Sequence, residues 1–486
     1  MIRSFNLRIF MIFWVVLCVI VAAHHFIFYP LMAEILDINI IPEQGLIRGA
    51  LPGDNQTYYL IADKIFNSKM SFGDKLFPIG KDPNYFIGLI FSQFLYYFSG
   101  HSLLFFSWFV NTPLMALGLV QIYFVAKQFK IPDRTLYILM FILVFVPFNF
   151  YSVTQINKDI FTFVFFALNL NTIFKINSSG SFPSLNISLI CIFAFVLFAV
   201  RPYQLTLFSV SWLLLSFLFL IRTKSILCAV KPIFVSGLLI LVYFLAAHFI
   251  GADPRVNEMD GLSSEVTTYP VDVLGKRSQN QNHSIGQTDG ISQKESIGQT
   301  EGISQKESIG QRENISNNDV TTHTDNGMAK DSITLELVID NLILKLNGYR
   351  QHFINSTPVA AMIIDRDLRF NSLADLVVYF PKAIKNLLIE PNPFRLLGDK
   401  KGYVNPVLKW FYLPWMLYLY ILLIKMITMN IRNMHSYEAL LLSFFIFSTL
   451  LPYAYFIPNL GTVARYSSPM IFYLASVLAF SQVNSR

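Results

Sequence analysis

Long apolar stretches separated by short polar turns dominate the hydropathy pattern of the chain. A helix that crosses a membrane needs roughly 20 mostly apolar residues. Stretches of this kind, some of them shorter, predict an all-α polytopic membrane protein with about ten transmembrane helices. The predicted spans cover residues 8–29, 103–126, 135–152, 160–175, 185–200, 203–221, 228–249, 406–425, 437–457 and 467–482.

One further apolar segment, residues 85–98, determines the predicted topology. It is short for a span and rich in aromatic residues, which suits an interfacial helix. If it does not cross the membrane, the basic residues between the spans face the cytoplasm, as the positive-inside rule favours. We therefore predict that both termini are cytoplasmic. The basic residues concerned are Lys127, Lys130, Arg134, Lys175, Arg222, Lys224, Lys231, Lys425 and Arg432.

Two large segments then face outward. The first covers residues 30–101 and belongs to an N-terminal transmembrane region of residues 1–249. The second covers residues 251–405, ahead of a C-terminal transmembrane region of residues 406–486. The other outer loops are predicted to be short, and they lie around Asn157-Lys158-Asp159, around Arg201-Pro202 and over residues 458–466.

A polar repeat occupies the first part of the second outer segment. Its 12-residue unit begins at Ser284, Ser296 and Ser308, and Gly, Ser, Gln and charged residues dominate it. Three copies of so polar a unit cannot bury a continuous core. Residues 250–330 are therefore predicted to be a disordered insert.

Amphipathic patterning resumes after the insert, in residues 331–405. Apolar residues at helical spacing predict one helix that begins near Leu335 and a second over residues 373–388, broken at Pro381. We expect both helices to pack at the outer membrane face.

Composition limits the class of protein. Hydrophobic residues make up 54% of the 486 residues and charged residues only 14%, whereas a soluble domain carries roughly 25% charged residues. This excludes a soluble enzyme and a disulfide-rich secreted module. The net charge of +7 includes no dense basic run, so no nucleic-acid partner is predicted. The three cysteines show no metal-binding spacing.

Charged residues gather where the predicted spans meet the outer loops. Because charges are costly in a membrane, these residues are the first functional candidates. A carboxylate can accept a proton from an acceptor hydroxyl, and arginine can hold a phosphate through parallel hydrogen bonds. The candidates are Asp54, Lys158, Asp159, Arg201, Arg350 and Arg465.

Each candidate also has a simpler interpretation. Asp54 follows Pro-Gly and suits a turn, and Asp159 suits a helix N-terminus. Lys158 and the two arginines at 201 and 465 could contact lipid headgroups in general, and Arg350 could be an ordinary surface residue.

The order of these features resembles the GT-C class of membrane glycosyltransferases, which includes protein O-mannosyltransferases and the aminoarabinose transferase of lipid A. In that class an acidic residue follows the first helix, a second acidic position opens a later helix, and Arg-Pro and Arg-Tyr pairs occur near outer helix ends. The matching segments are Gly53 to Ala62, Pro83 to Gly100, Asn157-Lys158-Asp159, Arg201-Pro202-Tyr203 and Asn459 to Pro469.

The resemblance implies transfer of a sugar from a polyprenyl-phosphate-linked donor. Asp54 would be the catalytic base and Asp159 would assist it or orient a substrate. Lys158, Arg201 and Arg465, with Arg350 as a further candidate, would bind the lipid phosphate, while Tyr58 and Tyr466 would line the sugar pocket. Asn55 stands where many members carry a second acidic residue, so no metal site is assigned, and a divalent cation is left open as cofactor.

The resemblance also implies the partners. These are the polyprenyl-phosphate-linked sugar donor, a glycan, lipid or protein acceptor, and membrane lipids. We expect the bacterial inner membrane, with the active face outward, and a role in cell-envelope glycan assembly. A weaker resemblance to O-antigen polymerases keeps a polysaccharide polymerase as an alternative. A flippase or transporter of lipid-linked sugars is a second alternative.

Overall fold

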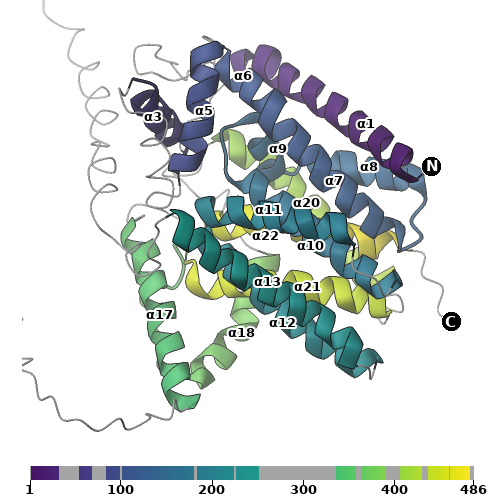
Figure 1. Cartoon of the computed structure of the whole chain (residues 1–486), viewed down its shortest axis with the longest axis vertical. Helices are drawn as coiled ribbons and strands as arrows, with labels where there is room; N and C mark the ends of the chain where they lie inside the picture. Colours follow the sequence, from purple (N-terminus) through teal and green to yellow (C-terminus); the bar gives the residue numbers. More distant parts are fainter. Residues whose placement is uncertain are drawn as a thin grey trace, which may run out of the picture. The chain divides into compact units, whose positions relative to one another are not determined.

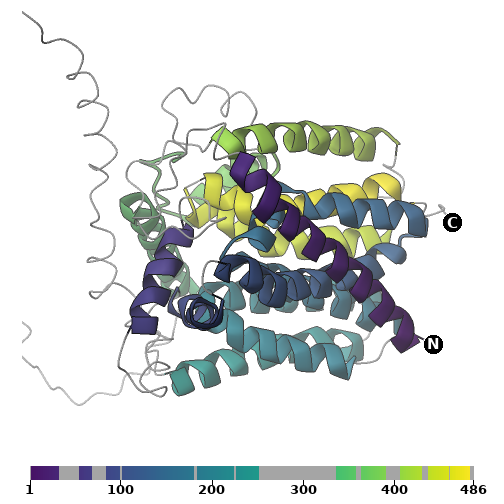
Figure 2. The ribbon, with the colours of Figure 1, turned by 90° about the horizontal axis from the view of Figure 1, so that it is seen from above.

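The computed structural model describes the chain in several stretches, to which all statements below refer (Figures 1 and 2). Contacts divide the chain into two units, Met1–Asp260 with Ile339–Arg486, and Gly261–Val338. Of the second unit only residues 335–338 are described, so the predicted repeat insert lies outside the described residues. The described stretches are 2–31, 54–67, 84–98, 101–179, 183–223, 226–250, 335–356, 363–389, 406–429, 436–458 and 460–481.

These residues form helices and no β-strand, in agreement with an all-α class. The N-terminal helices are α1 (Ile2–Ala23) with η1 (His24–Phe28), α3 (Asp54–Asn67), α5 (Tyr85–Tyr97), and α6 (Ser102–Phe106), which continues through η4 (Ser107–Asn111) into α7 (Thr112–Lys127). Next come α8 (Asp133–Val144), α9 (Pro147–Thr154), α10 (Asp159–Ser179), α11 (Ser184–Val200), α12 (Pro202–Thr223) and α13 (Ile226–Ile250). The last are α17 (Leu335–Ser356), α18 (Leu373–Leu388), α20 (Pro406–Met429), α21 (Tyr437–Phe456) and α22 (Leu460–Phe480).

Several of the helices are long and apolar enough to cross a membrane, which makes this a multi-pass membrane protein. Among the described residues there are seven such helices, or eight if the bent pair α8–α9 counts as one span. The predicted number of ten is not confirmed: within the residues searched, Ser184–Val200 and Tyr412–Thr428 are shorter apolar helices. The seven are Leu7–Leu31, Ser102–Lys127, Asp159–Ser178, Pro202–Arg222, Ala229–His248, Tyr437–Phe456 and Thr462–Phe480.

Two of the seven lie at the centre of the bundle. The apolar window of α10 is 94% buried within the protein and that of α22 is 83% buried, against 33% for α1 and for α13. Helices α7 and α11 pack on α10, while α20 and α21 pack on α22. The central helices therefore face protein, and α1 and α13 present most of their apolar surface to lipid.

The predicted span over residues 135–152 is broken. Helices α8 and α9 meet at an angle of 69°, and Val146 between them has extended backbone angles (φ −54°, ψ 126°). Pro147 follows it and disfavours a helical conformation in the residue before it, which explains the break. The short helix α9 then leads the chain directly to the start of α10.

Two other helices differ from the predicted boundaries, and each contains a proline. Residues 458–466 were predicted as an outer loop, but α22 begins at Leu460 and continues through Pro469. Membrane helices tolerate proline where neighbouring groups satisfy the carbonyl that loses its partner. Helix α18 likewise continues through Pro381, where a break was predicted.

The ends of the helices lie at two ends of the bundle (Figures 1 and 2). Helices α10, α12 and α22 begin at one of them, where α3, α5 and α17 also lie, and we refer to it as the cap end. The start of α1 and the end of α22 lie at the opposite end. We call this the basic end, because it carries Lys127, Lys130, Arg134, Lys175 and Arg222 where α7, α10 and α12 end and α8 begins.

Hydrogen bonds from Asn111 hold the irregular segment that precedes α10. Its buried side-chain Nδ2 donates to the carbonyls of Val153 (3.2 Å) and Gln155 (2.8 Å). This connects the start of α7 to the chain just before Asn157-Lys158-Asp159.

We expect Asn111→Leu to lower the free energy of unfolding by about 1–3 kcal/mol, because two buried hydrogen bonds are removed. Asn67→Leu, an equivalent change at an exposed position in α3, should change it by less than about 0.5 kcal/mol. Reversible unfolding in mixed micelles measures both. Equal effects would contradict a structural role for Asn111.

Candidate functional site

Three helix starts bring charged side chains together at the cap end. Asp159 is the first residue of α10, Arg201 directly precedes α12, and Arg465 lies in the second turn of α22. These are positions far apart in the sequence, and two of the three belong to the central helices. We call Asp159, Arg201 and Arg465 the charge cluster.

Asp159 and Arg201 form a buried ion pair. Arg201 Nη2 donates to Asp159 Oδ1, and the two side chains are only 3% and 8% exposed, Arg201 being the less exposed. Arg465 is more open, at 28%, and its Nε lies 3.8 Å from Asp159 Oδ2. Two guanidinium groups thus approach one carboxylate in a poorly hydrated place.

Tyrosines surround the guanidinium of Arg201. It lies over the ring of Tyr466, 4.4 Å from the centroid, which is a favourable cation–π distance. Its Nη1 donates to the hydroxyl of Tyr203 (3.1 Å), which lies 3.4 Å from the hydroxyl of Tyr466. The ring of Tyr453 on α21 packs 5.0 Å from that of Tyr466. These contacts orient Arg201 from three helices.

Local sequence explains how the ion pair is placed. Asn157 Oδ1 accepts from the backbone N–H of Asp159 (2.9 Å), so Asn157 caps the start of α10. Arg201 has non-helical angles (φ −158°, ψ 69°) because Pro202 follows it. The chain therefore leaves α11 and enters α12 at Arg201, and this turn directs the guanidinium toward the start of α10.

Some buried polar atoms of this region make no hydrogen bond with other described residues. They are Asn157 Nδ2, Asp159 Oδ2, Arg201 Nε and Gln204 Nε2. Buried polar groups are rarely left in this state without water or a ligand. The combination of unpaired donors and an acceptor beside two guanidinium groups suits an anionic ligand with further polar groups.

Helix α3 and the start of α5 approach the same region. Tyr58 is 2% exposed and lies near the Arg201 guanidinium. Lys158 Nζ donates to Asn84 Oδ1 (2.9 Å), which connects the start of α10 to the residue before α5. Asp54 is the first residue of α3, one turn before Tyr58, and its side chain lies outside the described part of the structure.

Arg350 has a different role. It is 1% exposed, so the surface interpretation is wrong. Its Nη1 donates to the carbonyl of Tyr455 (3.1 Å), and its Nη2 to those of Ile364 (3.1 Å) and Asp365 (2.7 Å). Burial lowers its pKa from the usual value. These bonds to backbone occupy the guanidinium, which is therefore structural.

Sequence reasoning selected all three residues of the charge cluster and missed two of the tyrosines around them. Tyr203 follows the Arg-Pro pair and could have been chosen from that position. Tyr453 lies within an apolar span and has no sequence signal. No group of three or more His, Cys, Asp or Glu in the described residues could hold a metal ion.

No protein-family model, curated protein or solved structure matches the chain. The features that bear on function are therefore the charge cluster, its tyrosines and its position at one end of a membrane bundle.

Breaking the buried ion pair between Asp159 and Arg201 should destabilise the folded protein. We expect Arg201→Gln to lower the free energy of unfolding by about 3–5 kcal/mol, because the Asp159 carboxylate stays buried without its main partner. The double change Asp159→Asn with Arg201→Gln should recover part of that loss. Unfolding in mixed micelles gives the coupling between the two positions.

The half-exposed pair between Lys382 and Asp365 (2.5 Å) is the matched control. Lys382→Gln should cost no more than about 1 kcal/mol. If Arg201→Gln were no more damaging than Lys382→Gln, the ion pair would not organise the helix starts.

Proposed function

We propose that this protein is an integral-membrane glycosyltransferase. It moves a sugar from a polyprenyl-phosphate-linked donor to an acceptor on the outer face of the bacterial inner membrane. The observation that carries the proposal is the buried charge cluster of Asp159, Arg201 and Arg465, lined by tyrosines at one end of the bundle. A donor of this kind brings an anion and a sugar to that depth of the membrane.

The arginines bind the phosphate. Guanidinium groups hold phosphate oxygens through parallel charge-assisted hydrogen bonds. Arg201 is fixed by Asp159 and the tyrosines, whereas Arg465 is partly exposed and has looser contact with Asp159. The donor phosphate would therefore meet Arg465 first and share Arg201 with the carboxylate. Lys158 adds a further positive charge nearby.

Asp54 activates the acceptor. The acceptor hydroxyl oxygen attacks the anomeric carbon and gives its proton to Asp54, while the bond from that carbon to the phosphate oxygen breaks. Polyprenyl phosphate leaves with an additional negative charge, which Arg201 and Arg465 stabilise. Tyr58 and Tyr466 line the sugar pocket.

Asp159 is assigned a positioning role. Its Oδ1 already accepts from Arg201, and a carboxylate held by an arginine is a weaker base. It sets the position of Arg201 and keeps two like charges close together without a ligand.

The charge distribution supports the orientation. The basic end carries Lys127, Lys130, Arg134, Lys175 and Arg222, and such residues favour the cytoplasm. The cap end would then face outward, and both termini would be cytoplasmic. Helices α3 and α5 would lie at the outer interface beside the donor.

Mass spectrometry of surface glycans from cells with and without the gene tests the proposed class. Loss of one sugar from a glycan supports a transferase. Accumulation of single unpolymerised repeat units would instead indicate a polymerase, and retention of the lipid-linked intermediate on the inner leaflet would indicate a flippase.

Asp54→Asn should reduce sugar transfer by about 100-fold or more, because removal of a general base typically costs 10²–10⁴-fold in rate. Protein level and unfolding midpoint should stay within error of the wild type. Asp63→Asn in the same helix, whose side chain contacts Asn67, is the control and should keep its activity. Full activity of Asp54→Asn would refute the assignment of the base.

A further inference from the structure

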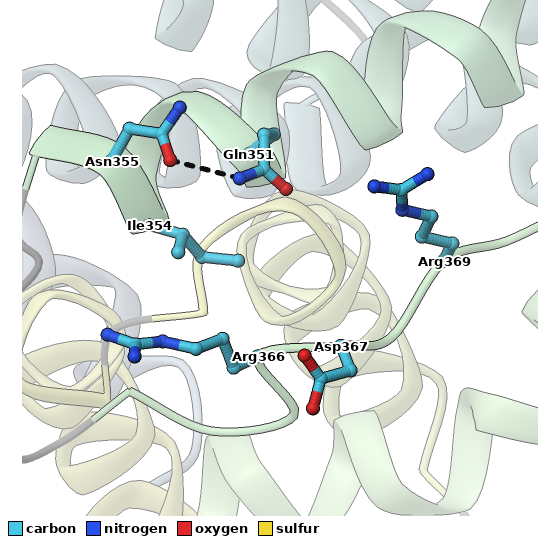
Figure 3. Close-up of a pocket in the computed structure, with 6 residues that line it drawn as sticks. All are labelled: Gln351, Ile354, Asn355, Arg366, Asp367 and Arg369. Atoms are coloured by element: carbon cyan, nitrogen blue, oxygen red, sulfur yellow. Dashed lines mark hydrogen bonds between the residues drawn. The ribbon is translucent and has the colours of Figure 1, made fainter. Parts of the chain in front are cut away.

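A second polar site lies on the cap, outside the charge cluster. It is a cleft of about 650 Å³ between α17 and the turn that leads to α18 (Figure 3). Figure 3 shows the α17 side chains on one side of the cleft and the turn on the other. The lining residues are Gln351, Ile354, Asn355, Arg366, Asp367 and Arg369.

The turn is held rigidly against α17 by two buried or half-buried side chains. Arg350 donates to the carbonyls of Ile364 and Asp365 at its start. Asn347 fixes its end, because its Nδ2 donates to the carbonyl of Phe370 (2.7 Å) and its Oδ1 accepts from the N–H of Phe370 (3.0 Å). The residues between are therefore presented in one geometry.

Asp365 adds to this rigidity. Its backbone is in the left-handed region (φ 50°), which is uncommon for a residue other than glycine. Its carboxylate accepts from Tyr379 (3.1 Å) and from Lys382 (2.5 Å). Burial and the nearby Asp365 carboxylate raise the pKa of Tyr379 to about 12, so the hydroxyl remains a donor. Such strained and fully bonded turns are frequent at ligand sites.

The lining chemistry defines the ligand. Arg366 and Arg369 are exposed, and with Asp367 they give the cleft a formal charge of +1. Arginine recognises carboxylates through paired hydrogen bonds. Gln351 donates to Asn355 (3.0 Å), and each amide has a further polar atom to offer to a hydroxyl group. Ile354 is the one apolar lining side chain, which disfavours a lipid tail or an aromatic ligand.

We propose that this cleft binds a saccharide that carries a carboxylate. Arg366 and Arg369 bind the carboxylate, and the amides of Gln351 and Asn355 bind hydroxyl groups.

Residues that support the cleft and residues around the charge cluster both contact the C-terminal end of α21. Tyr455 and Pro458 accept hydrogen bonds from the cap through their carbonyls. Two residues before Tyr455, Tyr453 packs on Tyr466 of the charge cluster lining. If the proposed transfer reaction holds, the acidic saccharide is part of the acceptor. This last assignment rests on the proposed function, whereas binding of the saccharide does not.

The full chain in nanodiscs of neutral phosphatidylcholine should be titrated calorimetrically with trigalacturonic acid, and with maltotriose as the neutral probe. We expect saturable binding of trigalacturonic acid that is at least about tenfold tighter than that of maltotriose, a difference of about 1.4 kcal/mol. The double variant Arg366→Gln with Arg369→Gln should weaken it by about tenfold or more. Both arginines are exposed, so the variant should keep its fold.

Arg134→Gln changes an exposed arginine at the basic end and is the matched control, which should bind as the wild type does. Absence of saturable binding, equal binding of maltotriose, or unchanged binding by the double variant would each overturn the proposal. Displacement of the saccharide when phosphatidylglycerol is added to the nanodiscs would also overturn it and assign the cleft to lipid headgroups. None of these measurements requires sugar transfer, so failure of the proposed function would be seen separately.

Discussion

The ion pair between Asp159 and Arg201 is the interaction on which the arrangement of the cap end depends. It lies inside the protein, where an uncompensated charge would destabilise the fold. The pair forms only if α10 begins at Asp159 and the chain turns at Arg201-Pro202. It therefore sets where two helices start, and through Tyr466 and Arg465 it also sets the position of the central helix α22. The Asp159 carboxylate lies near both guanidinium groups and so reduces the repulsion between them.

The end of α21 connects this centre to the outer cap. Tyr453 belongs to the aromatic lining of Arg201, and the carbonyl of Tyr455 accepts from the buried Arg350. Arg350 in turn holds the turn that bears Arg366 and Arg369. A displacement of this short segment of α21 would therefore move side chains both of the charge cluster and of the cleft. Such a connection suits a reaction in which a lipid-bound donor and a polar acceptor must be brought together.

Hydropathy predicted most of the long helices because they are apolar over a length close to that of a membrane. Hydropathy failed for helical segments that are buried by other helices instead of by lipid. The first turns of α22 are polar around Arg465 and were predicted as a loop, yet they pack against other helices. Pro147 and Pro202 were visible in the sequence, but only the second was interpreted as placing a functional residue. Arg350 and Tyr453 could not be assigned from sequence, because their partners come from distant segments. The catalytic role of Asp54 is proposed from the order of the sequence features, whereas binding of the lipid phosphate is proposed from the charge cluster as well.

Direct binding of the lipid phosphate tests the central claim best. Native mass spectrometry of the purified protein with added polyprenyl phosphate would count bound lipid for the wild type, Arg465→Gln and Arg134→Gln. Arg465 is chosen because it is partly exposed and is not half of the buried ion pair. The account predicts that the wild type and Arg134→Gln retain the lipid equally, and that Arg465→Gln binds it about tenfold more weakly, as loss of one charge-assisted contact requires. Equal binding by all three proteins would contradict it.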